Sequence, residues 1–384
     1  MRRGLVLAFT LALGGFAAPV AAQDGWLAAK LGEFRERYAF PGATAAIALP
    51  DGTVMTAATG LADVEAGRAI TAETPMLAAS IGKSFVAATV LALESEGRLS
   101  RDDLLAVHGG DRPWFDALPN AGTITIDHLL HHTSGLPDHV HLPEFQEEWT
   151  LLTTDAGDFE PERLITFVAG REPLFEAGEA WAYSDTGYVL LGLVIEAVTG
   201  QAWHEAVRTR LVDPLDLGGT IPSNRPDLPG LAVGYVAPDN PFGLPARTAD
   251  AERRLLWDPA VESAGGGFAS TSADLARWGH LLFGGEAMDA PYLDRLLDGV
   301  PVDPDAPGII YGAGVAIYAD TPRGPVWGHG GWIPGYVSSL RHYPDHGVTL
   351  AFQINTDIGV MDNSSDLVPA LEAELADLAI EAVR

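Results

Sequence analysis

Apolar residues recur at helical spacing in three long stretches of the chain. They fall on one helical face from Asp24 to Tyr38, from about Ser80 to Glu96 and from about Asp366 to Val383. Pro41-Gly42 follows the first stretch and Gly97 follows the second, and both are typical helix-ending signals. The pattern therefore predicts two helices in the first hundred residues and one at the C-terminal end.

Short runs with the composition of β-strands lie toward both ends of the chain. Residues 44–49 and 53–59 flank Pro50-Asp51-Gly52, where glycine readily adopts positive φ, so they are expected to form an antiparallel hairpin. Pro344 to Gly347 is a second turn signal between two strand-like runs. The later strands are predicted at 312–318, 324–328, 336–343 and 348–354.

The middle of the chain, from about 106 to 261, is rich in proline and glycine and contains short helical patterns at 126–132, 160–169 and 187–198. Strand patterns are scarce there, and the regular strand–helix alternation of a doubly wound fold is absent. We therefore predict an α+β fold, an antiparallel sheet flanked by helices with an inserted, mostly helical subdomain. The sheet region covers about 23–105 and 262–384, which makes 23–384 a single domain.

The first 22 residues have the three parts of a secretory signal. Arg2 and Arg3 precede an apolar run from Gly4 to Phe16, and Val20-x-Ala22 offers a cleavage point before Gln23. A buried N-terminal helix is the alternative. The sequence holds no later run of about 20 apolar residues. We expect export, removal of residues 1–22 and a periplasmic or secreted protein with no stable membrane anchor.

Composition narrows the range of functions. Acidic residues outnumber basic ones 52 to 23, which gives a net charge of −29 that repels phosphate backbones and anionic lipids. Nucleic-acid binding is therefore excluded. The chain has no cysteine, which removes disulfides, thiolate catalysis and cysteine-ligated metals. We expect no cofactor, and a small molecule or short peptide as the partner.

Lysine is rare in this chain, and one of the two lysines lies close to a serine. The chain has 21 arginines but only Lys30 and Lys83. Lys83 follows Ser80 by three residues at a predicted helix start, so both side chains emerge on one face of a single turn. A lysine, unlike an arginine, can lose its proton and accept one from a serine hydroxyl. The alternative is that Ser80 only caps the helix.

Two further motifs accompany Ser80-x-x-Lys83: Tyr183-Ser184-Asp185 and His329-Gly330-Gly331, the latter near the start of a predicted strand. In this order the three motifs resemble those of the serine β-lactamase and penicillin-binding protein superfamily, S-x-x-K, Y-x-N and K-T-G. The resemblance is closest to the class C β-lactamase, DD-carboxypeptidase and esterase branch. It covers nearly all of 23–384, because 132–136, 179–184 and 265–271 also look like that branch.

The resemblance implies a role for each matching residue. Ser80 would be the acylated nucleophile, Lys83 its base partner and Tyr183 a second proton-transfer group. His329 would lie on the strand that walls the substrate cleft, and the backbone N–H groups of Ser80 and Trp332 would form the oxyanion hole. The implied substrate-binding residues are Asp185, His329, Gly330, Gly331 and Trp332.

The chain departs from the family pattern at two motifs. Asp185 replaces the usual Asn, and a carboxylate beside Lys83 would raise the lysine pKa. Either Asp185 is protonated or turned away, or Lys83 stays cationic and Tyr183 takes the serine proton. His329-Gly330 replaces Lys-Thr, which leaves at most a pH-dependent cation to hold a substrate carboxylate. Esters, D-amino-acid amides and short peptides are therefore expected to be better substrates than penicillins.

Three alternatives remain open from the sequence. A dense group of imidazoles and carboxylates could hold a catalytic metal, although H-E-x-x-H is absent; its members are His128, His131, His132, His139, His141, Asp127 and Asp138. Residues 78–82 imitate the nucleophile turn of an α/β-hydrolase. The third alternative is a non-catalytic protein of the same fold that binds cell-wall peptides.

Overall fold

The computed structural model describes residues 20–151, 160–238, 240–306, 308–360 and 363–384. Helix α1 (Val20–Tyr38) begins before the predicted cleavage point at Gln23, and the rest of the predicted signal lies outside the described residues. Within the part of the chain that is described, no helix is both long and apolar enough to cross a bilayer.

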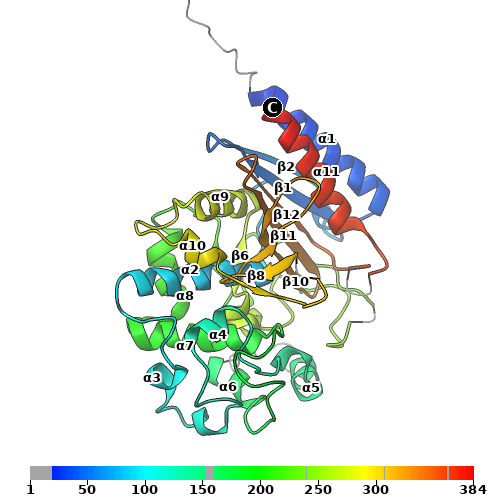
Figure 1. Cartoon of the computed structure of the whole chain (residues 1–384). Helices are drawn as coiled ribbons and strands as arrows, with labels where there is room; N and C mark the ends of the chain where they lie inside the picture. The colour runs from blue at the N-terminus through cyan, green and yellow to red at the C-terminus, as the bar shows by residue number, and fades with distance from the viewer. Residues whose placement is uncertain (1–19, 152–159, 239, 307, 361–362) are drawn as a thin grey trace, which may run out of the picture.

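A nine-stranded sheet, counted over the described residues, forms the centre of the molecule (Figure 1). Its strand order is β3-β2-β1-β12-β11-β10-β9-β8-β7, and all neighbours are antiparallel. This pairing confirms the predicted sheet and rules out the α/β-hydrolase alternative. The strands are β1 (Gly42–Ala48), β2 (Val54–Asp63), β3 (Arg68–Ala69), β7 (Val300–Pro301), β8 (Ile309–Tyr311), β9 (Ala316–Tyr318), β10 (Val326–Ile333), β11 (Tyr336–Tyr343) and β12 (Val348–Ile354).

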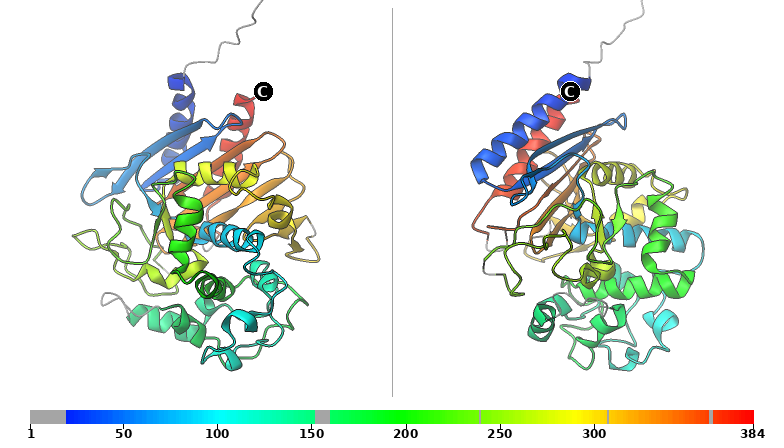
Figure 2. Two further views of the ribbon diagram at one scale, coloured as in Figure 1. Left: turned by 90° about the vertical axis from the view of Figure 1, so that its left-hand side faces the viewer. Right: turned by 180° about the vertical axis from the view of Figure 1, so that it is seen from behind.

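The two ends of the described chain meet on one face of this sheet. Strand β1 pairs with β12, where Ala43 lies opposite Ile354. Helices α1 and α11 (Leu367–Ala382) lie side by side over this face (Figure 2). The Tyr38 hydroxyl donates to Asp366 at 2.8 Å. Apolar side chains of both helices and of β1 and β12 are buried between the helices and the sheet, including Leu31, Phe34, Phe352 and Leu371.

The opposite face carries helix α2 (Gly82–Ser95), which begins just after Ser80. Phe85 of α2 stacks on Trp278 of α9 (Ser272–Phe283), with ring centroids 4.1 Å apart. The Trp278 indole N–H donates to Ser84 at 2.8 Å. A second, three-stranded sheet joins β4 (Met76–Leu77) and β5 (Ile221–Pro222) to β6 (Phe268–Ser270). It holds the segment before Ser80 against the glycine-rich segment at 265–267.

The inserted subdomain is helical in its first part only. Its helices are α3 (Leu105–Gly109), α4 (Ile126–Leu130), α5 (Pro143–Leu151), α6 (Pro161–Thr166), α7 (Asp185–Thr199) and α8 (Trp203–Val207), with short helical turns at Phe115–Ala117, His139–His141 and Arg208–Val212. The described residues between 223 and 258 form loops without helix or strand. A 3₁₀ segment, Pro259–Gly265, leads back to β6, and α10 (Leu293–Leu297) precedes β7.

Candidate active site

Ser80 lies in a short 3₁₀ turn, Ala79–Ile81, immediately before α2. Ala79 has φ of +50°, a conformation that non-glycine residues rarely adopt. The turn is held by the Ser338 hydroxyl, which donates to the Ala78 carbonyl at 2.7 Å, and by the Ala78 N–H, which donates to Phe268 at 2.9 Å. Neither this turn nor α2 has a side-chain cap, so the helix-capping interpretation of Ser80 is wrong.

Lys83 is fully buried and joins three elements through its ammonium group. Its Nζ donates to Ser80 Oγ at 3.1 Å, to the Gly265 carbonyl at 2.5 Å and to Asp185 Oδ1. The approach to Gly265 depends on Gly82, where a Cβ atom would lie 1.9 Å from the Gly266 carbonyl oxygen. The predicted contact between the lysine amine and the serine hydroxyl is therefore present.

The protonation state of Lys83 follows from these neighbours. Burial by itself lowers the lysine pKa, but the charges of Asp185 and Tyr183 and the hydrogen bond to Asp185 outweigh it and raise the pKa above its ordinary value. Lys83 is therefore an ammonium ion in the resting site. Of the two arrangements left open by the sequence, the structure has Asp185 turned toward a cationic lysine.

The Tyr183 ring lies over Lys83, with its centroid 4.8 Å from Nζ. Burial raises the pKa of its hydroxyl to about 12, although Lys83 and Ser80 partly oppose the shift. The hydroxyl is buried without a hydrogen-bond partner in the described part of the chain. The ring also lies 4.3 Å from that of His132. Tyr183 is thus a neutral phenol at ordinary pH, with an oxygen available to a bound substrate.

His329 lies in the middle of β10, not near the start of a strand as predicted. Its Nδ1 faces the Gly330 carbonyl at 2.5 Å, so this nitrogen carries the proton, and Nε2 accepts from the Tyr311 hydroxyl at 2.9 Å. Burial, together with repulsion from Lys83, lowers the pKa of His329 to about 3. The sequence left at most a pH-dependent cation at this position, and in the structure the ring is neutral with both of its nitrogens engaged.

The two glycines of the third motif have different surroundings. A Cβ at Gly331 would lie 2.3 Å from the Ala78 carbonyl oxygen and 2.2 Å from Ser338 Oγ, so β10 approaches the nucleophile turn closely at this position. A Cβ at Gly330 would find its nearest atom, Arg341 Nη2, at 3.7 Å. Trp332 follows, and its indole N–H donates to Asp357 at 3.2 Å.

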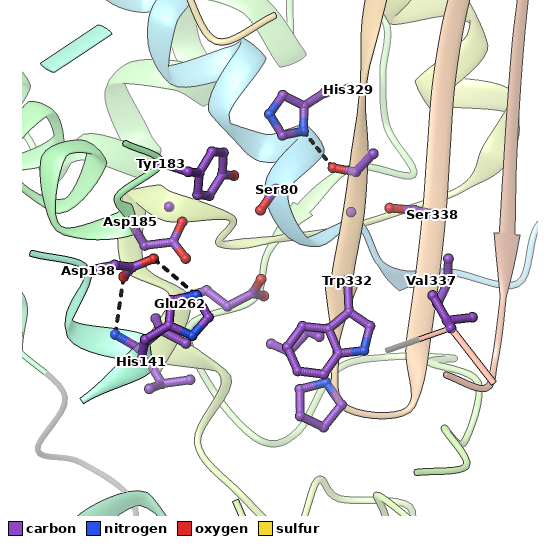
Figure 3. Close-up of a pocket in the computed structure, with 18 of the residues that line it drawn as sticks. Ser80, Asp138, His141, Tyr183, Asp185, Glu262, His329, Trp332, Val337 and Ser338 are labelled. Carbon is purple, nitrogen blue, oxygen red and sulfur yellow. Dashed lines mark hydrogen bonds and ion pairs between the residues drawn. The ribbon is translucent and has the colours of Figure 1, made fainter. Parts of the chain in front are cut away.

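The site opens into a cavity of about 430 Å³ that residues of β10 and β11 help to line (Figure 3). Seven of the residues predicted from the sequence line it, namely Ser80, Tyr183, Asp185, His329, Gly330, Gly331 and Trp332, while Lys83 is buried beneath Ser80. Sequence reasoning missed Glu262, Ser338 and the apolar wall. Asp138 also lines the cavity, but the sequence had placed it in the histidine-rich group.

The histidine-rich group does not form a metal centre in the described residues, where no three such side chains converge. The His131 ring nitrogens face the carbonyl oxygens of Asp127 and Asp298 at 2.9 and 2.8 Å. His139 bonds the Thr186 hydroxyl at 3.0 Å, and His132 packs against Tyr183. Each of these imidazoles thus contacts its own protein partners, and they do not act as a group.

The fold and the contact between Ser80 and Lys83 are now described, and the comparisons with known proteins give the family of the chain. The family model described as Beta-lactamase matches residues 27–374. The chain therefore belongs to the β-lactamase family.

Relatives in this family are similar over much of the chain. Penicillin-binding protein 4* of Bacillus subtilis is 28% identical over 70% of this chain, which spans 58% of that protein. Penicillin-binding protein 4 of Amycolatopsis lactamdurans is 28% identical over 91% of this chain and 89% of its own length. A D-stereospecific amidohydrolase from a Streptomyces species superposes with a TM-score of 0.74 and 28% identity, covering 86% of this chain and 94% of that one. The chain is accordingly a hydrolase of the serine type.

Proposed function

We propose that this protein hydrolyses D-amino-acid amides, short D-peptides and related esters through an acyl-enzyme on Ser80, in preference to β-lactams. The observation that carries the proposal is the position of Lys83 Nζ, which contacts both Ser80 Oγ and Asp185 Oδ1. A buried ammonium that joins a hydroxyl to a carboxylate provides a path for a proton.

In the proposed acylation step, Ser80 Oγ bonds to the substrate carbonyl carbon. Lys83 Nζ gives one of its own protons to Asp185 and takes the Ser80 proton in its place, so the lysine is cationic again when the step is complete. The N–H groups of Ser80 and Trp332 receive the oxyanion. When the C–N bond breaks, the proton returns from Asp185 through Lys83 and the Tyr183 hydroxyl to the leaving nitrogen.

In deacylation, water attacks the Ser80 ester and its proton follows the same path to Asp185. That proton then returns to Ser80 Oγ as the ester bond breaks and the acid leaves. Both half-reactions begin and end with a cationic Lys83, in agreement with its raised pKa.

The charges around the cavity support the choice of substrate. His329 is neutral, and the Arg341 guanidinium pairs with Glu372 at 3.0 Å. A penicillin carboxylate would therefore meet no unpaired cation among the described lining residues. The similarity to a D-stereospecific amidohydrolase favours an amide substrate with D configuration.

Covalent labelling tests the acyl-enzyme directly. A fluorophosphonate should add its mass to the peptide that contains Ser80, and Ser80→Ala should abolish both labelling and hydrolysis of D-amino-acid p-nitroanilides. Lys83→Arg should abolish most turnover although it keeps the charge, because a guanidinium does not release its proton. Tight peptide binding without any Ser80-dependent hydrolysis would instead support a non-catalytic receptor.

We further propose export to the periplasm or beyond the cell, with removal of residues 1–22. The basic start, apolar run and small-residue end of this segment support it. Mass spectrometry of the protein recovered from the cell envelope and the medium should find a mature N-terminus at Gln23. An intact N-terminus on a cytoplasmic protein would contradict it.

A further inference from the structure

The cavity contains more carboxyl groups than its cations can neutralise. Asp138, Asp185 and Glu262 all line it. Asp185 is paired with Lys83, and Arg341 of β11 is paired with Glu372. Asp138 and Glu262 therefore lack a lysine or arginine partner in the described part of the chain.

Glu262 is partly buried, and its carboxyl group points into the cavity. Figure 3 shows this group between Asp185 and Trp332, on the side of the cavity below Ser80. Its Oε2 atom is buried without a hydrogen-bond partner among the described residues. Its Oε1 atom occupies space left by Gly266, where a Cβ atom would lie 2.3 Å away. Burial and the nearby charge of Asp185 raise the pKa of Glu262 to about 8, although Lys83 opposes the shift.

Asp138 reaches the same cavity from the inserted subdomain. It accepts the Val140 N–H at 3.1 Å, and the rings of His139 and His141 lie 3.9 and 3.8 Å from its oxygens. Burial lowers the pKa of His139 to about 4, so this ring supplies no charge at neutral pH. Burial, together with Asp185, raises the pKa of Asp138 to about 8. Like Glu262, Asp138 would be stabilised as an anion by a cation entering the cavity.

The remaining wall of the cavity is largely apolar and includes several aromatic rings. Trp149, Phe242 and Trp332 line it, and Phe242 lies 4.3 Å from Trp149 and 6.1 Å from Trp332 between ring centroids. Such a wall fits a hydrocarbon side chain, and the face of an aromatic ring also attracts a cation. The cavity therefore suits a molecule with an apolar body and a positive group near its reacting carbonyl.

We propose that Glu262, assisted by Asp138, binds the free α-ammonium group of the substrate and thereby selects amino-acyl amides with an unmodified amino end. This inference rests on the proposed acyl-enzyme function. The α-ammonium lies two bonds from the carbonyl carbon that Ser80 attacks, so its binding group has to lie beside the nucleophile turn. Glu262 meets this requirement because its Oε1 and the Ala79 carbonyl carbon lie on the same side of Gly266. A Cβ atom built at Gly266 would be 2.3 Å from the first and 3.1 Å from the second.

The test compares two substrates that differ only in the amino group, D-phenylalanine p-nitroanilide and 3-phenylpropanoic acid p-nitroanilide. The amino preference is the ratio of their kcat/KM values. Glu262→Gln should lower this ratio at least tenfold while the kcat/KM of the des-amino substrate changes by less than threefold. Asp138→Asn should lower it in the same direction by a smaller factor. Glu252→Gln removes the same charge from an exposed position and should leave the ratio unchanged.

Two outcomes would overturn the inference. An unchanged ratio in both variants would show that neither carboxyl binds the ammonium. Equal losses on both substrates, in a Glu262→Gln protein with wild-type circular dichroism, would assign Glu262 to the chemical step itself, as a base for the attacking water.

A binding measurement separates this inference from the proposed function. Calorimetry with Ser80→Ala and D-phenylalaninamide should detect binding that is weakened at least tenfold in the Ser80→Ala, Glu262→Gln double variant. If no substrate shows Ser80-dependent hydrolysis, the proposed function fails, while the calorimetric comparison still decides the role of Glu262. Equal affinities of the two variants would overturn the ammonium site.

Discussion

Lys83 Nζ donates three hydrogen bonds, one to the nucleophile Ser80 and one to each of two distant parts of the chain. Ser80 is in the same helical turn, Asp185 begins α7, and Gly265 precedes β6. With all three donors engaged and a carboxylate beside it, the ammonium is the stable form. The catalytic question at this scale is therefore where the serine proton goes.

Asp185→Asn tests the proton path. Without the carboxylate, the relay loses its acceptor and Lys83 has to be neutral before it can act as a base. Burial then lowers the lysine pKa without the opposing charge of Asp185. We expect kcat/KM at pH 7 to fall by at least about tenfold, consistent with the loss of a general base, and to recover as the pH is raised. Steady-state pH profiles measure this, and a profile and rate identical to the wild type would remove Asp185 from the path.

Because the His329 ring is neutral, we expect a substrate preference that does not vary with pH. Its pKa of about 3 keeps the ring neutral across the ordinary range. The ratio of kcat/KM for nitrocefin to that for 3-phenylpropanoic acid p-nitroanilide, which has no titrating amino group, should therefore stay low and flat between pH 5 and 8. A steep rise of nitrocefin hydrolysis toward pH 5 would indicate a cationic His329 and contradict this assignment.

Spacing along the chain was enough to predict the contact between Ser80 and Lys83, because both residues lie within one turn. Asp185 was identified only through the resemblance of its motif. Glu262 carried no usable signal, since a carboxylate three residues before a glycine run is ordinary in so acidic a chain. Its importance depends on which cations the fold places near it, and sequence spacing does not contain that information.

At the scale of elements, Gly331 determines how closely β10 approaches the Ala79–Ile81 turn that contains Ser80. Gly331→Ala would force a Cβ against the Ala78 carbonyl and the Ser338 hydroxyl, the two groups that hold the turn together. Gly330→Ala adds a methyl group where the nearest atom is 3.7 Å away. We expect Gly331→Ala to lower both kcat/KM and the thermal unfolding temperature far more than Gly330→Ala does. Equal effects on kcat/KM would contradict the close-contact argument.

Predictions of elements succeeded where the local pattern was unambiguous. Strands β11 and β12 have the predicted bounds, because the turn from Pro344 to Gly347 fixes the register of two buried strands. The predicted helix from Ser80 begins instead at Gly82, since the positive φ of Ala79 turns the chain just before it. The loops at 223–258 follow no periodic pattern. Their course depends on contacts with distant parts of the chain, such as the hydrogen bond from the Tyr235 N–H to the carbonyl of Asn355, just after β12.

For the whole molecule, buried titratable groups predict a stability maximum near neutral pH. Burial lowers the pKa of His139 and His342 to about 4 and, with Lys83, that of His329 to about 3, so their unfolded forms bind protons first and stability falls as the pH drops below about 6.5. Asp138 and Glu262 have pKa values raised to about 8. Their contribution is present below the ordinary carboxyl pKa and is lost as the pH rises through 8.

Urea unfolding at pH 5, 6.5 and 8.5 checks this profile. The free energy of unfolding should be highest at pH 6.5. Glu262→Gln cannot ionise, so relative to the wild type it should become more stable between pH 6.5 and 8.5. A constant difference between the two proteins at all three pH values would show that the Glu262 carboxyl is not protonated in the folded state.

The pairing of β1 with β12 has a consequence for how the chain folds. Ala43 and Ile354 lie opposite each other although about three hundred residues separate them, so the centre of the sheet can close only after most of the chain has been made. Ser338, which holds the turn before Ser80, belongs to the same late segment. The nucleophile is thus among the last features to be assembled during synthesis, and an incomplete chain would carry Ser80 without the support that makes it reactive.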